Sequence, residues 1–123
     1  MLITNLNLKK QIKLLIDSLK FKNDTFVHRD FHVSNIVYDK NEFGLIDTQD
    51  ALIGNIAYDL ASLVDDVRFK TSLDQKNRMI DYYLKLNPKL DVEKFKNDFA
   101  ILSVLRNLKI IGIFTRLSFG KIF

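Results

Sequence analysis

Apolar residues recur at helical spacing in the first segment of the chain, with lysine and glutamine on the opposite face. This periodicity predicts an amphipathic helix over residues 8–20. Three short apolar runs follow at 25–28, 35–39 and 43–47, and they predict three strands. Because only residues 40–42 separate the second run from the third, these two are expected to form a β-hairpin. The apolar face of the first helix comprises Leu8, Ile12, Leu15, Ile16 and Leu19.

Helical periodicity returns in the second half of the chain. Gly54 and Asn55 mark a turn, and a helix is predicted from Ile56 to about Val67. A second amphipathic helix spans 72–86 and stops before Pro88. A long last helix starts near Asp91, a good N-cap residue, and runs past Gly112. The apolar face of the 56–67 helix comprises Ala57, Leu60, Ala61 and Val64.

The order of these elements is helix, small sheet, then three helices, which predicts a mainly helical α+β fold. A length of 123 residues with 47% hydrophobic and 28% charged residues suits a single domain, residues 1–123. The net charge is +4, but no run of five like charges occurs, so nucleic acid is not expected as a partner. The absence of cysteine excludes disulfides and fits a reducing cytoplasm.

Two segments of the sequence bear on export and on membrane insertion. The N-terminal segment has no apolar stretch followed by a small-residue cleavage site, so a signal peptide is not expected. The most apolar late segment, residues 101–117, is interrupted by Arg106, Lys109 and Arg116. It is therefore interpreted as a buried helix with no membrane partner, and a cytoplasmic location is expected.

Polar residues of a chemically specific kind lie at the ends of the predicted strands. Asp30 follows the first strand, Asn35 opens the second, and Asp47 ends the third. Pairing of the second and third strands would bring Asn35 and Asp47 to the same end of the hairpin, next to the loop that carries Asp30. Two carboxylates and an amide suit a hard cation such as Mg²⁺, which takes phosphate oxygens as further ligands. The remaining carboxylate would accept a proton from a hydroxyl group.

Residues 28–35, "HRDFHVSN", also match the H-R-D-x-x-x-x-N catalytic loop of kinases letter for letter. A narrower resemblance rests on three further segments, "LIDTQDA", "YDLASLVDD" and the late "LRNLKIIGIFTRL". With these segments the chain resembles the aminoglycoside phosphotransferase and choline kinase superfamily and, within that superfamily, the bacterial anomeric sugar kinases of cell-wall recycling. That resemblance implies the C-terminal lobe of a protein-kinase-like fold, with metal ligands on a small hairpin. It also implies transfer of the ATP γ-phosphoryl group to a hydroxyl of N-acetylmuramate or N-acetylglucosamine.

The resemblance carries roles over to matching residues. Asp30 would be the catalytic base, while Asn35 and Asp47 would bind the Mg²⁺ that bridges the ATP phosphates. His28, Arg29 and Asp59 would support the catalytic loop. Residues that bind the acceptor are not identified by the match.

One part of a kinase is missing from the sequence. The Gly-rich loop and strand lysine of the ATP-binding N-lobe precede the H-R-D motif in kinases, whereas the residues before His28 contain no glycine. The chain is therefore expected to be a C-terminal lobe only, whose N-lobe is either absent or supplied by a separate polypeptide. The alternative function is a truncated or split lobe without catalysis of its own, inert or acting as a binding module.

Other interpretations of these residues stay open at this stage. Asp30, Asn35 and Asp47 would also suit turns and helix caps. His28, Asp30 and His32 occupy alternate positions, which is the spacing that zinc ligands on one face of a strand would have. The acidic residues Asp50, Asp65 and Asp66 are expected to be solvated or capping. Arg106, Lys109 and Arg116 are expected to be solvated or paired, or to touch an acidic sugar. Core positions are expected at Met79, Phe95, Phe99 and Phe114.

Overall fold

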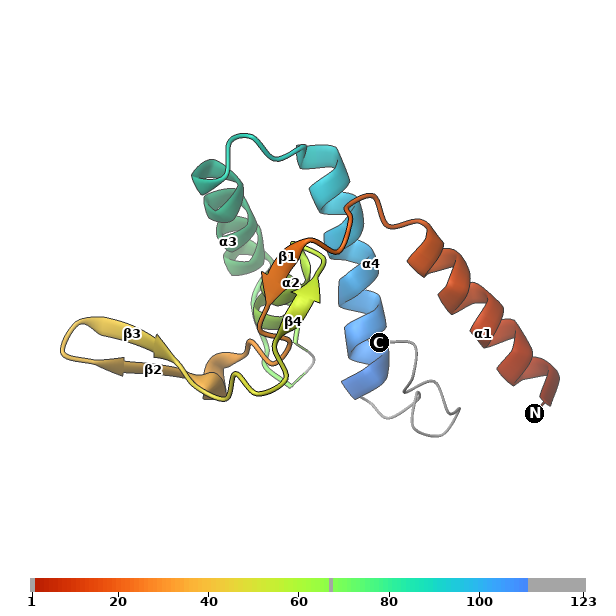
Figure 1. Cartoon of the computed structure of the whole chain (residues 1–123), viewed down its shortest axis with the longest axis horizontal. Helices are drawn as coiled ribbons and strands as arrows, with labels where there is room; N and C mark the ends of the chain where they lie inside the picture. The colour runs from red at the N-terminus through yellow and green to blue at the C-terminus, as the bar shows by residue number, and fades with distance from the viewer. Residues whose placement is uncertain (1, 67, 111–123) are drawn as a thin grey trace.

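Helix α4 lies near the centre of the molecule, with α1 on one side of it and α2, α3 and the β1–β4 sheet on the other (Figure 1). The computed structural model describes residues 2–66 and 68–110. The two small sheets lie between α1 and α2 in the sequence, and the β2–β3 hairpin extends from the side of the molecule opposite α1. The elements are α1 (Leu2–Asp17), β1 (Thr25–Val27), a 3₁₀ turn (Val33–Asn35), β2 (Ile36–Asp39), β3 (Glu42–Leu45), β4 (Leu52–Gly54), α2 (Tyr58–Val64), α3 (Leu73–Leu86) and α4 (Val92–Ile110). This arrangement confirms a mainly helical α+β fold.

The core lies where α2 and α3 pack against α4. Its fully buried residues come from the predicted apolar face of α2 and from the N-terminal half of α4, and Met79 and Tyr83 of α3 cover them. Phe95 has no exposed surface and stacks on Tyr83 with ring centroids 5.2 Å apart. A large buried side chain of this kind stabilises the fold by about 3–5 kcal/mol relative to alanine. The buried residues are Ala57, Ala61, Val64, Phe95, Phe99 and Leu102.

Helix α1 packs on the other side of α4 through a smaller apolar cluster. Ile12 is buried against Ile101 and Leu105, and the remaining residues of the predicted apolar face lie partly buried around them. The helix begins earlier and ends earlier than the predicted range of 8–20, since it spans Leu2–Asp17. Its face was predicted correctly because burial follows the 3.6-residue repeat.

The hairpin is confirmed, with antiparallel pairing from Ile36–Leu45 to Asp39–Glu42. Lys40 and Asn41 form its two-residue turn, and both have positive φ angles of 48° and 67°. Positive φ at both positions is typical of the type I′ turn that suits strand twist. Compared with the predicted runs, β2 starts one residue later and β3 covers only Glu42–Leu45.

Strand β4 was missed by the sequence analysis, which placed only a turn at residues 54–55. Leu52–Gly54 pairs antiparallel with β1, with Phe26 opposite Ile53. A three-residue strand is too short to show alternation, so its partner can only be seen in the folded chain. The pairing fixes the direction in which the chain leaves β1 and enters the H-R-D loop.

Two of the helices begin at capping residues, of which Asp91 was predicted from the sequence. Ser72 accepts a hydrogen bond from Gln75 N at the start of α3, and Asp91 accepts one from Lys94 N at the start of α4. Helix α2 is shorter than the predicted 56–67 range, since it covers Tyr58–Val64. The predicted continuation of α4 past Gly112 lies outside the described residues. Phe114 and Arg116 lie outside them as well.

Candidate functional site

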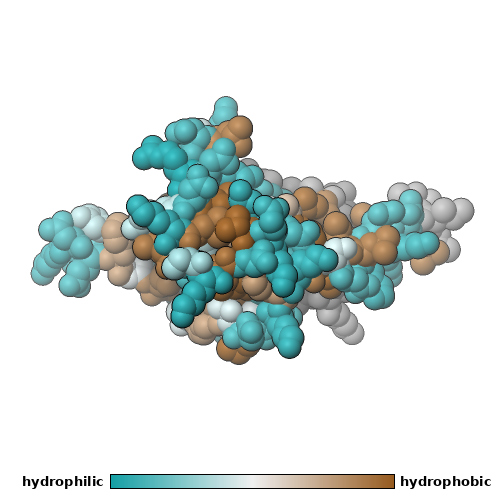
Figure 2. All heavy atoms as spheres, turned by 90° about the horizontal axis from the view of Figure 1, so that it is seen from above, coloured by the Kyte–Doolittle hydropathy of each residue, from teal (hydrophilic) through white to brown (hydrophobic). Residues whose placement is uncertain are grey.

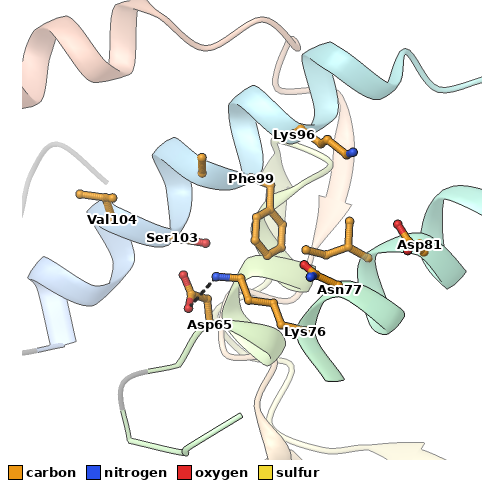
Figure 3. A pocket seen from close by; sticks show the side chains of 10 residues that line it. Asp65, Lys76, Asn77, Asp81, Lys96, Phe99, Ser103 and Val104 are labelled. Atoms are coloured by element: carbon orange, nitrogen blue, oxygen red, sulfur yellow. Dashed lines mark ion pairs between the residues drawn. The ribbon is translucent and has the colours of Figure 1, made fainter. Parts of the chain in front are cut away.

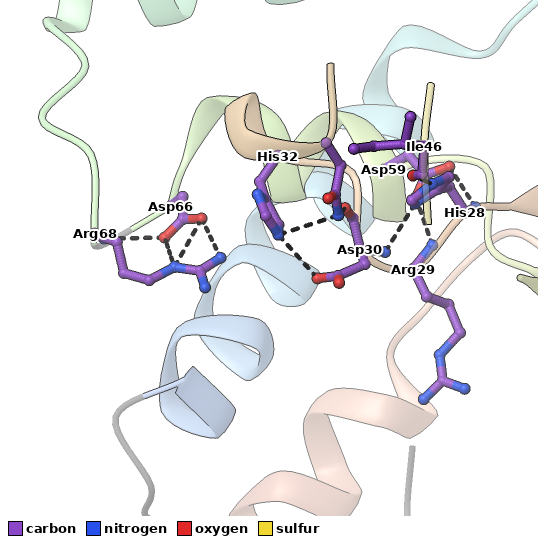
Figure 4. Close-up of polar contacts among 9 residues, drawn as sticks. His28, Arg29, Asp30, His32, Ile46, Asp59, Asp66 and Arg68 are labelled. Atoms are coloured by element: carbon purple, nitrogen blue, oxygen red, sulfur yellow. Dashed lines mark hydrogen bonds and ion pairs between the residues drawn. The ribbon is translucent and has the colours of Figure 1, made fainter. Parts of the chain in front are cut away.

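The backbone of the H-R-D loop is held by one carboxylate. Asp59, in the first turn of α2, accepts hydrogen bonds from His28 N at 2.8 Å and Arg29 N at 3.1 Å (Figure 4). Arg29 has a φ angle of 75°, a left-handed conformation that is strained for a residue with a side chain. The two bonds to Asp59 therefore stabilise a turn that the local sequence would not favour by itself.

The imidazole of His28 connects the same loop to the strand that leads to Asp47. It is buried, with 2% of its surface exposed. Its Nε2 lies 2.9 Å from Ile46 O, and its Nδ1 accepts from Asp30 N at 3.2 Å. A carbonyl oxygen needs a donor and a backbone N–H needs an acceptor, so the neutral tautomer with hydrogen on Nε2 satisfies both bonds. His28 thus sets the spacing between the Asp30 loop and the end of β3.

Asn35 and Asp47 lie at the same end of the hairpin. Asn35 O accepts a hydrogen bond from Ile46 N at 3.0 Å, which extends the ladder of β2 and β3 to the residue just before Asp47. Asn35 Nδ2 donates to Asp30 O at 2.8 Å. Since the amide nitrogen is anchored in this way, the amide oxygen is the end of the Asn35 side chain that can act as a metal ligand. The pairing expected from the sequence is therefore present.

The side chain of Asp30 is accessible but oriented. It is 43% exposed, and its Oδ1 lies 3.2 Å from Nε2 of His32. Asn35 Nδ2 also lies 3.4 Å from the same nitrogen, but Nε2 cannot both donate to Asp30 and accept from Asn35. We assign its hydrogen to Asp30, since that contact is shorter and its acceptor is a carboxylate. His32 therefore restricts the orientation of the Asp30 carboxylate through one of its oxygens.

These residues fit a magnesium site by the chemistry of their donors. The Asn35 amide oxygen and the exposed Asp47 carboxylate are hard oxygen ligands, and Mg²⁺ commonly takes one or two of these with water and phosphate oxygens. Within residues 2–66 and 68–110, no group of three or more histidine, aspartate or glutamate side chains is placed to hold a metal ion. Asp47 has a φ angle of 60°, so its backbone is also in the left-handed region. Strain of this kind occurs at functional sites.

A zinc site at His28, Asp30 and His32 does not fit the structure. These residues lie in a loop instead of alternating along a strand, which ends at Val27. Both ring nitrogens of His28 are engaged by the backbone, at Ile46 O and Asp30 N. No lone pair of His28 is left for a metal in this arrangement.

Asp66 is buried and paired instead of solvated, which corrects the sequence expectation. Its carboxylate binds Arg68 through Nε and Nη2, at distances of 2.7–3.2 Å, and also accepts from Arg68 N (Figure 4). Burial by itself would raise the pKa of Asp66, but the hydrogen bonds from Arg68 and the charges of Arg68 and Arg106 hold that pKa below its usual value. Asp65, next to it, pairs with Lys76 at 3.1 Å.

A cavity of about 620 Å³ lies away from Asp30, Asn35 and Asp47. It opens between the end of α2, α3 and α4, where Asp65, Lys76, Phe99 and Ser103 line it (Figure 3). The predicted site is instead a convergence of loop and hairpin ends, which is the form expected where the rest of a cleft comes from elsewhere. Within the described residues, no helix is long and apolar enough to cross a bilayer.

Two residues that organise the site were missed in the sequence. Asn55 was interpreted as a turn residue, and Asp98 was not considered, yet both are buried and bonded to each other at 2.8 Å. Asp98 also accepts from Lys20 N and Phe21 N, at the start of the segment that leads to β1. An aspartate on the core face of a predicted helix was the available signal, because such a residue needs buried donors.

The amino-acid sequence of the chain is similar to those of known phosphotransferases. A model of the phosphotransferase enzyme family matches residues 6–94 of the chain. An N-acetylmuramate/N-acetylglucosamine kinase of Caulobacter vibrioides is 34% identical over 97 residues, which cover 75% of this chain and 27% of that protein. The proteins of the same name from Neisseria meningitidis serogroup B and Pseudomonas aeruginosa are 34% and 31% identical, each over 89% of this chain and 34% of their own length. The chain spans about a third of the length of the curated relatives it matches.

Proposed function

The chain belongs to the phosphotransferase enzyme family, and from that premise we propose that it is the catalytic lobe of an ATP- and Mg²⁺-dependent kinase. The reaction is transfer of the ATP γ-phosphoryl group to a hydroxyl of an amino sugar. The observation that carries the proposal is the hydrogen bond from Asn35 Nδ2 to Asp30 O, which ties the Asn35 side chain to the backbone of the residue proposed as the base.

Asp30 acts as the base in this proposal. A base must be accessible to the hydroxyl group and must be held in position, and support for both comes from its 43% exposure and its contact with His32. In phosphoryl transfer, most of the rate acceleration comes from positioning and charge neutralisation. The bonds of Asp59 to the loop backbone serve the first requirement, because they fix the segment on which Asp30 stands.

Asn35 and Asp47 hold the metal in this proposal. When bound, Mg²⁺ neutralises charge on the ATP phosphates and orients the γ-phosphoryl group. The chain's own contribution is to keep two oxygen donors at one end of the hairpin, through the ladder from Asn35 to Ile46 and through the imidazole of His28. The amino-sugar acceptor is supported by the names of the relatives, which are N-acetylmuramate/N-acetylglucosamine kinases. On the same resemblance we propose a role in cell-wall recycling in the cytoplasm.

The proposal treats residues 1–123 as one domain that works with a nucleotide-binding lobe. Apolar side chains stand exposed on both small sheets. The face of the molecule that is seen from above in Figure 2 also has apolar surface between hydrophilic areas. Phe26 and Ile53, which are directly paired, are 64% and 61% exposed. Exposed apolar surface of this kind is typical of interfaces. We propose that a second lobe, on the same or a separate polypeptide, covers part of it.

Calorimetry on the purified chain tests the metal and nucleotide part of the proposal. ATP is titrated with and without Mg²⁺, into the natural chain and into Asp47→Asn. We expect binding that EDTA abolishes and that Asp47→Asn weakens at least tenfold. Asp30→Asn is the matched control, since it removes the base without removing a metal ligand, and nucleotide binding should persist while transfer to amino sugars is lost.

The opposite results would favour the alternative function. Absence of Mg²⁺-dependent binding at millimolar ATP would mean that this lobe alone is inert or serves only as a binding module. Unchanged turnover in Asp30→Asn, in an assembly that contains the nucleotide-binding lobe, would remove Asp30 as the base.

A further inference from the structure

The cavity between the end of α2, α3 and α4 is lined by a buried hydroxyl group that has no partner. Ser103 of α4 is 4% exposed, and its Oγ makes no hydrogen bond with the described residues. Figure 3 shows this oxygen on the side of α4 that faces Asp65 and Lys76, which line the same cavity. A buried polar group without a hydrogen bond costs free energy, and in folded proteins such a group usually has a partner. The cavity therefore contains a group that a ligand would satisfy.

A second buried group of α4 lies outside this cavity. Arg106 is 6% exposed, so it is buried instead of solvated, which corrects the sequence expectation, and its Nη1 also has no hydrogen-bond partner. Its guanidinium carbon lies 5.9 Å from the centre of the Tyr58 ring, at the start of α2. The residues that line the cavity do not include Arg106. Among the unpartnered buried groups of the described residues, Ser103 is the one that lines this cavity.

The end of the cavity around Ser103 carries balanced charge. Asp65 Oδ1 binds Lys76 Nζ at 3.1 Å, and the same nitrogen lies 5.8 Å from the centre of the Phe99 ring. The ion pair leaves no net charge at this end, while the hydroxyl group of Ser103 can both donate and accept a hydrogen bond. A neutral group with donors and acceptors, such as an amide, suits this end. A charged group would have to compete with the ion pair.

The other end of the cavity carries one anion and one cation that are not paired. Asp81 of α3 and Lys96 of α4 line it, and Figure 3 shows both on the side of Phe99 that is opposite Ser103. Within residues 2–66 and 68–110, neither side chain has an ion-pair partner within 4.0 Å. Lys96 precedes Ser103 by about two helical turns, or about 10 Å. A ligand that carries both an ammonium group and a carboxylate would complement this end.

We propose that this cavity binds a zwitterionic amino acid whose long side chain ends in a neutral amide or ureido group. Asp81 binds the ammonium group, Lys96 binds the carboxylate, and the neutral end of the side chain binds Ser103 Oγ. Ile80 and Phe99 line the cavity between these groups and cover the methylene groups of the ligand. The volume of about 620 Å³ is typical of small-molecule sites. L-citrulline is a suitable probe, because its carboxylate and its ureido nitrogen lie about 10 Å apart when the molecule is extended.

The test is calorimetric titration of L-citrulline into the full chain, beside three analogues that each lack one group. L-norleucine lacks the ureido group, Nα-acetyl-L-citrulline lacks the ammonium group, and L-citrulline amide lacks the carboxylate. We expect L-citrulline to bind with millimolar affinity or tighter and each analogue to bind about fivefold more weakly. Ser103→Ala, Asp81→Asn and Lys96→Gln should each weaken L-citrulline to a similar extent. Each variant should leave unchanged the affinity for the analogue that lacks the matching group, in the order just given.

The variants are suited to this test because they should keep the fold. Asp81 and Lys96 are exposed, and Ser103→Ala removes a hydroxyl group that makes no hydrogen bond within the described residues. Lys94→Gln and Asp74→Asn are matched controls on α4 and α3, since both residues are exposed and neither lines the cavity. Their affinity for L-citrulline should equal that of the natural chain.

Three results would overturn the inference: no binding of L-citrulline at about 20 millimolar, equal affinity for all four compounds, or an affinity that none of the three cavity variants changes. An equal loss in Lys94→Gln and Lys96→Gln would also overturn it, because the effect would then be one of general surface charge. The inference goes beyond the proposed function. The nucleotide titrations with Asp47→Asn judge that function separately, since Asp47 does not line this cavity.

Discussion

Asn55 Nδ2 donates a buried hydrogen bond of 2.8 Å to Asp98 Oδ2, across 43 residues of sequence. Asn55 also accepts from Ala57 N, at the entrance to α2. Asp98 accepts hydrogen bonds from Lys20 N and Phe21 N, which lie between α1 and β1. One buried pair therefore connects α4 with the segments that enter and leave the small sheets, and through them it positions both the H-R-D loop and Asp59.

Replacing Asn55 by aspartate should break this connection. The new carboxylate would face Asp98 in a buried site, and two carboxylates at this distance cannot both be ionised. We expect Asn55→Asp to lower the free energy of unfolding by about 3 kcal/mol at neutral pH, as measured by urea denaturation. Asn41→Asp, the same change in the exposed hairpin turn, should stay within about 0.5 kcal/mol. Equal effects at the two positions would show that the buried pair does not organise the fold.

The stability of the chain should fall at acidic pH because of Asp98. Burial would raise the pKa of this carboxyl, but hydrogen bonds from Asn55, Phe21 N, Lys20 N and Asn97 together hold that pKa below its usual value. A carboxylate with a lowered pKa in the folded state contributes stability that is present above the unfolded pKa. That contribution is lost as the pH falls through about 4 toward the folded pKa.

Urea midpoints between pH 6 and pH 3 measure this loss. Asp66 has a lowered pKa as well, with Arg68 as its partner, so Arg68→Gln serves as the control that removes most of the Asp66 contribution. We expect the decline below about pH 4 to persist in that variant. A flat profile in Arg68→Gln would attribute the acid sensitivity to Asp66 instead.

Asp59 should be needed for the order of the H-R-D loop. In Asp59→Asn, one carboxylate oxygen becomes an amide group that cannot accept from the backbone, so one of the N–H groups of His28 and Arg29 loses its acceptor. We expect a loss of about 1–3 kcal/mol, together with faster hydrogen exchange at His28 N and Arg29 N. Asp74→Asn is a matched control, because Asp74 also lies in the first turn of a helix but its side chain is 83% exposed. Unchanged protection of both amides in Asp59→Asn would contradict this role.

The backbone at Asp47 should favour glycine over alanine. Its φ angle of 60° is costly for a residue with a Cβ atom but not for glycine. We expect Asp47→Gly to be more stable than Asp47→Ala by about 1 kcal/mol, while both variants lose the carboxylate and bind Mg²⁺–ATP weakly. Asp39, in β2, should show the opposite order, with alanine the more stable. The same order at both positions would mean that Asp47 is not held in the left-handed region.

The amino-acid sequence by itself determined the helix faces, the hairpin and the candidate chemistry. Burial on α1 and α2 follows the 3.6-residue repeat, so Ile12, Ala61 and Val64 were identified as core residues from spacing alone. The spacing of Asp30, Asn35 and Asp47 around a hairpin was enough to expect them at one end, because antiparallel pairing leaves few registers. The predicted N-cap role of Asp91 is equally local, since a cap acts within three residues.

Only the tertiary structure decided which polar residues are buried and what they contact. Asn55, Asp66, Asp98 and Arg106 all occupy positions that their residue types would assign to turns or to solvent, yet each is buried. Strand β4 is recognisable only by its pairing with β1. These features depend on contacts between segments far apart in the chain, and the free energy of a buried charge is set by the partners that the fold brings to it, not by its neighbours in sequence.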